Sequence, residues 1–414
     1  MNTRPKNHAF VFNCHYNGLS IIQELGRHGV PVHALDSKRA VGTFSRYATF
    51  HHCPDPLYDE DAFIHFLIEK GCDFDIKPVL FPTNDQWAGA IARYKKDLEP
   101  YYHLCVADAP VVDLLINKDR FYRWAMDNNY PVPPIYTAEE VISGGPDIFP
   151  LIAKPIARRL PNLCNNNPEI SAFLDANRMA IISNISDFYQ FQKKFADYQD
   201  YYLFQEYIPG TGDQMYTVGI YANREHEVLG LFTGRKVRGY PPETGDCIVG
   251  QGERIPDNII ITVKNMVREL QFTGIAQFEY KKDSATGELR LLEINPRSWS
   301  WIGITPAFEV SLPWIAYADL TGIETIHYTE NVIKNGDIIF LHLLHDLKNS
   351  LYSYKKSGYP EYHKGFMVWV NELKGRRRVY AEFSWDDPLV ALYAMYTFGI
   401  STLTSFFRSK EKHT

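Results

Sequence analysis

The sequence predicts a mixed α/β and α+β fold, and three stretches carry that prediction. Residues 8–36 have the pattern of a buried strand, an amphipathic helix that stops at Gly29, and a second strand. Residues 78–94 repeat the order of strand, polar turn and helix. Residues 276–295 have the pattern of two strands joined by a turn that contains Gly287, an antiparallel hairpin. The first two stretches are typical of an open α/β domain, whereas the hairpin indicates an antiparallel sheet further along the chain.

Length, charge and cysteine usage limit the class of protein. The 414 residues are enough for two or three domains, and the net charge of −6 argues against a strongly basic nucleic-acid-binding protein. The six cysteines form no C-x-x-C pair, so we expect free thiols in a reducing cytoplasm and no zinc site. The opening residues, MNTRPKNHAF, lack the apolar run of a secretory leader. We therefore expect a cytoplasmic protein that places a few cations on small anionic ligands.

The hairpin carries an unusual set of polar side chains. If its strands pair symmetrically about the turn, Glu279 lies opposite Glu293, and Gln277 lies opposite Asn295. Like charges in directly opposed positions are destabilising, unless water screens them on a solvated face or a divalent cation lies between them. Mg²⁺ prefers such oxygen ligands and usually shares them with nucleotide phosphates. Arg297, just after the hairpin, suits a ligand that also has free anionic oxygens.

These residues resemble the signature of the ATP-grasp superfamily, which includes carboxylate–amine ligases, D-alanine–D-alanine ligase, biotin carboxylase and carbamoyl phosphate synthetase. The pair FEY and LLEINPR is the most specific part, and NKDRF, LIAKP and QEYIPG accompany it in the expected order. The likeness covers roughly residues 8–325. It implies a reaction in which a carboxylate attacks the γ-phosphate of ATP to give an acylphosphate and ADP. An amine, or less often another nucleophile, then displaces the phosphate.

The resemblance also implies the domain organisation and the cofactors. We expect a Rossmann-like pre-ATP-grasp domain, although its first loop, NCHYNGLS, lacks the G-x-G-x-x-G pattern of dinucleotide-binding folds. Two α+β lobes should then clasp ATP, with Mg²⁺, or alternatively Mn²⁺, between them. The expected boundaries are 1–115 for the pre-ATP-grasp domain, 116–205 for the small lobe with a linker helix, 206–325 for the large lobe with the metal site, and 326–414 for a C-terminal extension.

Individual roles follow from the match to the family pattern. Glu279, Glu293 and Asn295 match the Mg²⁺ ligands, and Arg297 matches the arginine that steadies the phosphoryl oxygens and the acylphosphate. These four positions lie within the FEY and LLEINPR segments. They are therefore the most specific of the expected site residues.

The nucleotide should contact residues from both lobes. Lys118 and Lys154 match basic positions that contact ATP phosphates, and Asp213 matches the carboxylate that hydrogen-bonds the ribose hydroxyls. Without the resemblance, these three are ordinary solvated residues at a helix terminus, a strand end and a turn. The hinge, whose backbone meets the adenine edge, consists of Glu206, Tyr207 and Ile208.

The acyl acceptor should meet a basic strand and the first domain. Lys236 and Arg238 fall on one face of an expected strand in 234–245, which suits an anionic substrate or intermediate and equally suits a solvated strand. Asn84 and Asp85 follow a strand of the first domain and fit either an amino group or a helix N-cap. The equivalent loop after the first strand offers His15, Tyr16 and Asn17.

The sequence departs from the family pattern after the LIAKP strand. Many members have a glycine-rich phosphate lid there, but residues 158–182 contain no glycine. The segment offers three cations instead: Arg158, Arg159 and Arg178. Side-chain cations in place of backbone N–H groups would still bind phosphate, and they also allow a protein that binds nucleotide but turns over slowly. Trp299 and Trp301, just after the signature, either wall a substrate pocket or pack as core.

The C-terminal extension raises a question about membranes. Residues 389–407 carry no charge and are about as long as a membrane span, but they include five Ser or Thr and a glycine. This composition favours a helix packed against a domain, and it leaves open an interfacial contact or a span. Basic residues flank the segment in KGRRRVY (374–380) and RSKEK (408–412).

We therefore expect an ATP- and Mg²⁺-dependent ligase that joins a carboxylate to an amine. The two alternatives are an ATP-grasp enzyme with a non-amine acceptor and a nucleotide-binding protein that is regulatory or inactive. The expected partners are small-molecule, peptide or glycan carboxylates and amines. A homodimer and a peripheral membrane contact through the C-terminal extension stay open.

Overall fold

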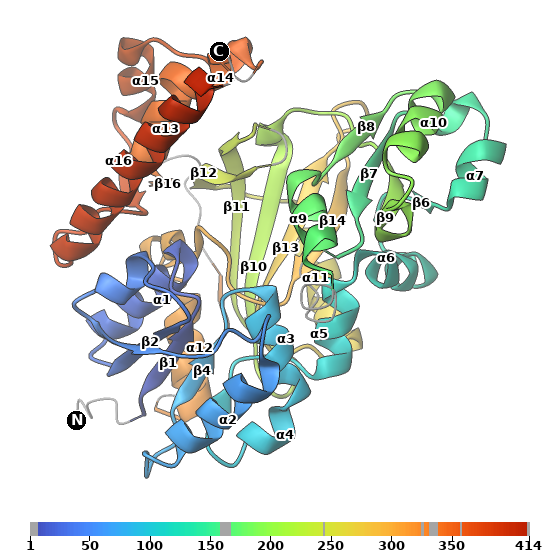
Figure 1. The fold of residues 1–414 in the computed structure, drawn as a ribbon. Helices are drawn as coiled ribbons and strands as arrows, with labels where there is room; N and C mark the ends of the chain where they lie inside the picture. The colour runs from blue at the N-terminus through green and yellow to red at the C-terminus, as the bar shows by residue number, and fades with distance from the viewer. Residues whose placement is uncertain are drawn as a thin grey trace.

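The computed structural model describes residues 7–157, 167–242, 245–323, 327–330, 338–356 and 358–411. Figure 1 shows their path from an N-terminal α/β domain, through a small lobe and a large central sheet, to a group of C-terminal helices. Arg158 and Arg159, two of the cations expected to replace a glycine-rich lid, lie outside the described residues.

An open parallel sheet forms the N-terminal domain, as the opening strand–helix–strand pattern predicts. The strand order is β3-β2-β1-β4-β5, and every neighbouring pair is parallel. The order reverses between β1 and β4, so the loops after these strands flank the crevice where open α/β sheets bind ligands. The elements are β1 (Ala9–Phe12), α1 (Tyr16–Arg27), β2 (Val32–Asp36), β3 (Ala48–His52), α2 (Glu60–Gly71), β4 (Val79–Phe81), α3 (Asp85–Arg93), α4 (Lys95–Leu98), β5 (His103–Leu104) and α5 (Ala109–Ile116).

The small lobe is a four-stranded antiparallel sheet with helices on it. Its strand order is β6-β9-β7-β8, and Phe188 and Phe191 of α10 belong to the aromatic core of the lobe. Helix α6 (Lys118–Asp127) leads into the lobe from the N-terminal domain. The other elements are β6 (Ile135–Tyr136), α7 (Ala138–Ser143), β7 (Leu151–Pro155), α9 (Pro168–Ala176), β8 (Ala180–Ile182), α10 (Ile185–Lys194) and β9 (Tyr202–Glu206).

The large lobe and the C-terminal residues share one eight-stranded sheet. Its order is β14-β13-β10-β11-β12-β16-β17, and β15 pairs with β11. Strands β16 and β17 come from the expected extension, which therefore continues the large-lobe sheet beyond β12. The large-lobe elements are β10 (Met215–Ala222), β11 (Val228–Tyr240), β12 (Asp246–Gly252), α11 (Asp257–Glu269), β13 (Gly274–Lys282), β14 (Leu289–Asn295) and α12 (Leu312–Thr321), and β15 (Thr329–Glu330) follows at the start of the expected extension. The C-terminal elements are β16 (Ile338–Leu341), α13 (Leu343–Lys348), a π-helical turn (Asn349–Ser353), α14 (Tyr354–Lys356), α15 (Phe366–Leu373), β17 (Arg377–Tyr380) and α16 (Pro388–Glu411).

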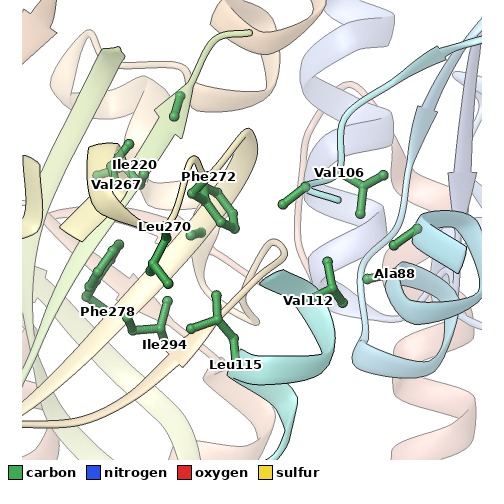
Figure 2. Close-up of a cluster of buried hydrophobic side chains, with 14 of the residues drawn as sticks. Ala88, Val106, Val112, Leu115, Ile220, Val267, Leu270, Phe272, Phe278 and Ile294 are labelled. Carbon is green, nitrogen blue, oxygen red and sulfur yellow. The ribbon is translucent and has the colours of Figure 1, made fainter. Parts of the chain in front are cut away.

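A buried apolar cluster joins the N-terminal domain to the back of the hairpin β13–β14. Figure 2 shows Val112 and Leu115 of α5 beside Phe272, Phe278 and Ile294 of the large lobe. All five side chains are buried, and burial of each contributes about 1.5–3 kcal/mol. The polar face of the hairpin is therefore backed by a packed core and points away from it, because strand side chains alternate.

Helix α16 is the segment whose sequence raised the question of a membrane. Its Val390 and Ala394 pack against Leu19 and Val41 of the N-terminal domain, which confirms the expected domain-packing helix. Within the part of the chain that the structure describes, no helix combines the length and apolarity needed to cross a membrane.

Candidate active site

The hairpin pairs in the register that the sequence predicts. Glu279 lies opposite Glu293, and Gln277 lies opposite Asn295. A bulge after this pair leaves Leu292 as an extra residue, since Tyr280 pairs with Leu291. Such a residue has backbone groups outside the strand ladder, and the Leu292 carbonyl accepts a hydrogen bond from the Tyr122 hydroxyl of α6.

The side-chain amide of Asn295 lies close to the carboxylates of both Glu279 and Glu293. Asn295 Nδ2 lies 3.4 Å from Glu279 Oε1, 3.4 Å from Glu293 Oε1 and 3.2 Å from Gln277 Oε1. Asn295 Oδ1 accepts from Arg297 Nη2 at 3.0 Å. The oxygens of two carboxylates therefore converge on one amide at the end of β14.

Burial and charge repulsion strain this carboxylate pair. Burial, and next the charge of Glu293, raises the pKa of Glu279 to about 7, although Lys236, Arg297 and Lys118 act in the opposite direction. Over the described residues, no group of three or more His, Cys, Asp or Glu side chains is placed to hold a metal. The oxygens that converge in the cleft are those of the two carboxylates, because Asn295 turns its Nδ2 toward them and its Oδ1 toward Arg297. This donor set fits a hard divalent cation that shares its remaining positions with water or phosphate.

Two lysines from different elements approach the pair. Lys118 is the first residue of α6, and Asn117 caps this helix by accepting a hydrogen bond from the N–H of Arg120. The Nζ of Lys118 lies 2.7 Å from Glu293 Oε2. Lys154 of β7 donates to the Tyr122 hydroxyl at 2.8 Å. Burial, followed by the charge of Lys118, lowers the pKa of Lys154 to about 7, and Glu293 opposes that change.

Arg297 joins the hairpin to the N-terminal domain. Its Nε donates to Asp85 Oδ1 at 2.9 Å, and its Nη1 donates to the Ser298 carbonyl at 3.0 Å. Asp85 is the first residue of α3, and the preceding Asn84 caps that helix by accepting from the N–H of Trp87. In this loop, Asn84 is therefore the helix N-cap, and its neighbour Asp85 positions Arg297.

These residues line a cleft of about 730 Å³ between the three parts of the molecule. Its position at the β1–β4 crevice is the one expected for an open α/β sheet. Of the residues expected at the site, the following line it: Lys118, Lys154, Arg178, Glu206, Tyr207, Ile208, Lys236, Glu279, Glu293, Asn295 and Arg297. His15, Tyr16 and Asn17 of the first loop line it as well.

Two expected residues lie elsewhere. Asp213 is not part of the cleft lining, and it accepts a hydrogen bond from Thr211 and lies 3.6 Å from Arg235. Arg238 was expected on the same strand face as Lys236, and this prediction is wrong. A bulge leaves Val237 without a partner on β12, because Lys236 pairs with Gly250 and Arg238 pairs with Val249. The bulge reverses the alternation of side chains, so the two cations leave β11 in different directions.

The structure adds two residues that the sequence interpretation did not name, and it places Gln277 beside Asn295. Tyr122 follows Lys118 by four positions on α6, so helical spacing places both on one face. Lys281 follows Glu279 by two on β13, and its Nζ lies 4.9 Å from the centre of the Tyr207 ring. Gln277 belongs to the same strand face. Trp299 and Trp301 are both buried and both contribute to the cleft wall, so the two alternatives for them hold together.

The comparisons with known proteins agree with this geometry. No family model matches the chain. In sequence, the chain is 25% identical over 255 residues to a D-aspartate ligase of Enterococcus faecium strain Aus0004, a match that covers 59% of this chain and 58% of that protein. The chain thus matches less than two thirds of the length of that relative.

Solved structures are similar over most of the chain. N5-carboxyaminoimidazole synthetase from Staphylococcus aureus in complex with ADP has a TM-score of 0.62 at 14% identity, over 87% of this chain and 88% of that one. L-amino acid ligase from Bacillus licheniformis has a TM-score of 0.56 at 15% identity, over 77% and 75%. The biotin carboxylase domain of Hydrogenobacter thermophilus 2-oxoglutarate carboxylase, in complex with MgADP, has a TM-score of 0.57 at 13% identity, over 79% and 72%. The chain therefore has the ATP-grasp fold, as the signature residues imply.

Proposed function

We propose that this protein is an ATP- and Mg²⁺-dependent ligase. It activates the carboxylate of an amino acid as an acylphosphate and joins it to an amine, with release of ADP and phosphate. The observation that carries the proposal is the convergence of Glu279, Glu293 and Asn295 beside Arg297, in a cleft that Lys118 and Lys154 also line. An amino acid is the favoured carboxylate, because the names of a sequence relative and a structural neighbour both specify one.

The cleft cations are arranged to take up phosphate charge. Lys154 is partly buried and its pKa is lowered to about 7, so an arriving phosphate favours its charged form. The Lys118 ammonium lies in the same cleft, 2.7 Å from a carboxylate oxygen of Glu293. Two cations from different elements thus line one cleft, which supports their assignment to the ATP phosphates.

The hairpin residues serve the transferred phosphoryl group. A bound Mg²⁺, held by Glu279, Glu293 and Asn295, would neutralise charge on the phosphoryl oxygens. Arg297 is held through Asp85 and Asn295, so that its guanidinium is preorganised for the charge that develops on the phosphoryl oxygens and the acylphosphate. Catalysis of this kind consists mainly of positioning and electrostatic stabilisation.

Lys236 lines the same cleft. It is buried, its Nζ donates to the Gly245 carbonyl at 3.0 Å, and it lies near enough to Glu279 to lower that carboxyl's pKa. We assign it to the anionic acyl group.

The donor half of the reaction can be tested without knowledge of the natural amine. Hydroxylamine traps an acylphosphate as a hydroxamate, so the full chain should be incubated with ATP, Mg²⁺, hydroxylamine and single D- or L-amino acids, aspartate first. We expect ADP and a hydroxamate in equal amounts with one such acid. Glu293→Gln should lose both products, and Glu288→Gln, at an exposed position near the same hairpin turn, should keep them.

A different result would assign the cleft another function. If the protein binds ATP but no amino acid raises ADP release above the rate without acid, the ligase proposal fails. A nucleotide-binding protein without turnover would then account for the fold. If bicarbonate alone raises ADP release, the enzyme uses carboxylation chemistry instead.

A further inference from the structure

Helix α16 has one partnered face and one face open to solvent. The inner face carries Val390 and Ala394, which pack on Leu19 and Val41, and Tyr393, whose ring stacks on Phe44 at 4.0 Å between centroids. Figure 1 shows the helix lying along the outside of the molecule between the N-terminal domain and the other C-terminal helices. The inner contacts account for how the helix is held.

The solvent-facing side of α16 is apolar, whereas the solvent-facing side of a surface helix normally carries charged residues. Helical positions 389, 392, 396 and 400 lie three or four residues apart and form one row. The exposed side chains of the row and its flanks are Trp385, Leu389, Leu392, Met395, Tyr396 and Ile400. No charged residue occurs from position 388 to position 407. We call these six side chains the α16 row.

The comparison with α11 shows how unusual the row is. That helix also packs one face on the molecule, through Ile259 and Val263, and it carries Asp257, Lys264 and Arg268 in the same 13 residues. Charged side chains on the outer face keep such a helix in water. The α16 row lacks them and therefore requires another kind of contact.

Charge distribution indicates which partner would cover the row. Residues 338–414 contain 11 Lys and Arg against seven Asp and Glu, whereas residues 1–337 contain 32 against 42. Three of those seven acids are buried in hydrogen-bonded pairs: Asp346 with Arg238, Glu382 with His342, and Asp387 with Ser45. The exposed charge of this region is thus strongly basic, and Arg408 and Lys410 follow the apolar segment in sequence.

We propose that the α16 row docks on an anionic lipid surface. An apolar helix face with adjacent basic residues buries its side chains at the headgroup boundary while the cations meet the lipid charge. Trp385, fully exposed next to the start of the helix, suits that boundary because the indole ring has an apolar body and a polar N–H. A second copy of the chain would bring two basic regions together, which charge repulsion opposes.

Vesicle binding of the full chain tests the proposal. The protein should co-sediment with vesicles of phosphatidylglycerol and phosphatidylcholine, and not with phosphatidylcholine alone. Leu392→Glu combined with Tyr396→Glu should weaken this partition at least about tenfold, because two side chains lose their burial. The matched control is Tyr189→Glu with Ile261→Glu, which makes the same charge change at exposed positions on α10 and α11.

A second measurement, fluorescence quenching, tests the proposal without introducing a charged residue into the α16 row. Brominated lipids should quench the fluorescence of the parent protein, and Trp385→Phe should remove that quenching, since Trp385 is the tryptophan in the row. Equal partition of the parent and the Leu392→Glu/Tyr396→Glu variant, with no loss of quenching in Trp385→Phe, would overturn the proposal. A dimer in sedimentation that this double variant dissociates, without vesicle binding by the parent, would assign the row to a second copy instead.

Discussion

Two groups of buried charges begin on the same strand, two residues apart, and they differ in how far the charges are compensated. Arg238 makes two 2.8 Å contacts with the two carboxylate oxygens of Asp346, which is wholly buried, and a 2.9 Å contact with Glu372. The same Asp346 accepts from Trp369 Nε1 at 2.7 Å. Lys236, on the other side of the bulge, belongs to the cleft with Glu279 and Lys154, whose pKa values are both shifted to about 7.

The difference separates structural charges from charges prepared for a ligand. The Arg238–Asp346 pair has the geometry that offsets the cost of desolvation, and it holds α13 and α15 of the C-terminal region onto β11. In the cleft, burial disfavours the charged forms of both Glu279 and Lys154. The protein itself therefore does not fully balance the charges of this site. An anionic nucleotide with a divalent cation would supply the missing partners. Buried charge marks a ligand site where its compensation is incomplete.

The largest expected effect is on stability, at the compensated pair. Asp346→Ala leaves the Arg238 guanidinium buried without its main partner, and we expect a loss of about 3–5 kcal/mol in the free energy of unfolding. Glu372→Ala removes the half-exposed member of the same group and should cost about 1 kcal/mol or less. Urea unfolding of both variants measures this, and a loss below 1 kcal/mol for Asp346→Ala would contradict the structural role.

The next effect concerns activity, at Lys236, two residues away on the same strand. Lys236→Met should lower the rate of ADP release about 100-fold, because a cation next to Glu279 and the acyl group is lost. Its free energy of unfolding should change by about 1 kcal/mol or less, in contrast to Asp346→Ala. Lys193→Met, at an exposed position of α10, is the control. An unfolding change as large as that of Asp346→Ala would remove the distinction between the two groups.

A smaller effect comes from a row of three partly buried histidines, His8, His33 and His51. His33 lies between His8 and His51, with nitrogen–nitrogen distances of 2.8 Å on each side. Burial, and next the neighbouring His51, His8 and Lys70, lowers the pKa of His33 to about 4. The folded state therefore binds fewer protons than the unfolded state between pH 6.5 and 4, and stability is lost as the pH falls through this window.

We expect about 1–2 kcal/mol of this loss to come from His33, since solvent screening of a half-buried ring reduces the effect. His33→Phe should flatten the dependence of the unfolding free energy on pH between 6.5 and 4. The exposed His65→Phe should leave it as in the parent. An unchanged slope in His33→Phe would show that the histidine row is not what lowers stability in acid.

The parts of the fold and the site that the sequence predicted are those that local pattern determines. Alternation along two strands joined by a short turn fixed the pairing of Glu279 with Glu293, and the strand–helix order indicated the parallel N-terminal sheet. The resemblance of the LLEINPR and LIAKP segments to the ATP-grasp signature implied that Arg297 and Lys154 share one site, and both line the same cleft.

The parts that escaped prediction depend on irregular or distant contacts. Alternation fails at Val237, where a bulge that no residue type announces turns Arg238 away from the cleft. The Asp85–Arg297 pair joins residues 212 positions apart, and the Arg238–Asp346 pair joins residues 108 apart. Such pairs become visible only when the chain is folded, and so does the addition of β16 and β17 to the large-lobe sheet.

The most direct test of the cleft is the Mg²⁺ dependence of its affinity for ATP, measured by calorimetry. We expect Mg²⁺ to tighten ATP binding to the parent at least about tenfold, since two partly buried carboxylates lose their mutual repulsion when a divalent cation lies between them. Glu293→Gln should abolish this gain, whereas Glu288→Gln, near the turn of the same hairpin, should retain it. An equal Mg²⁺ effect in Glu293→Gln and the parent would contradict the assignment of the Glu279–Glu293 pair as the metal site.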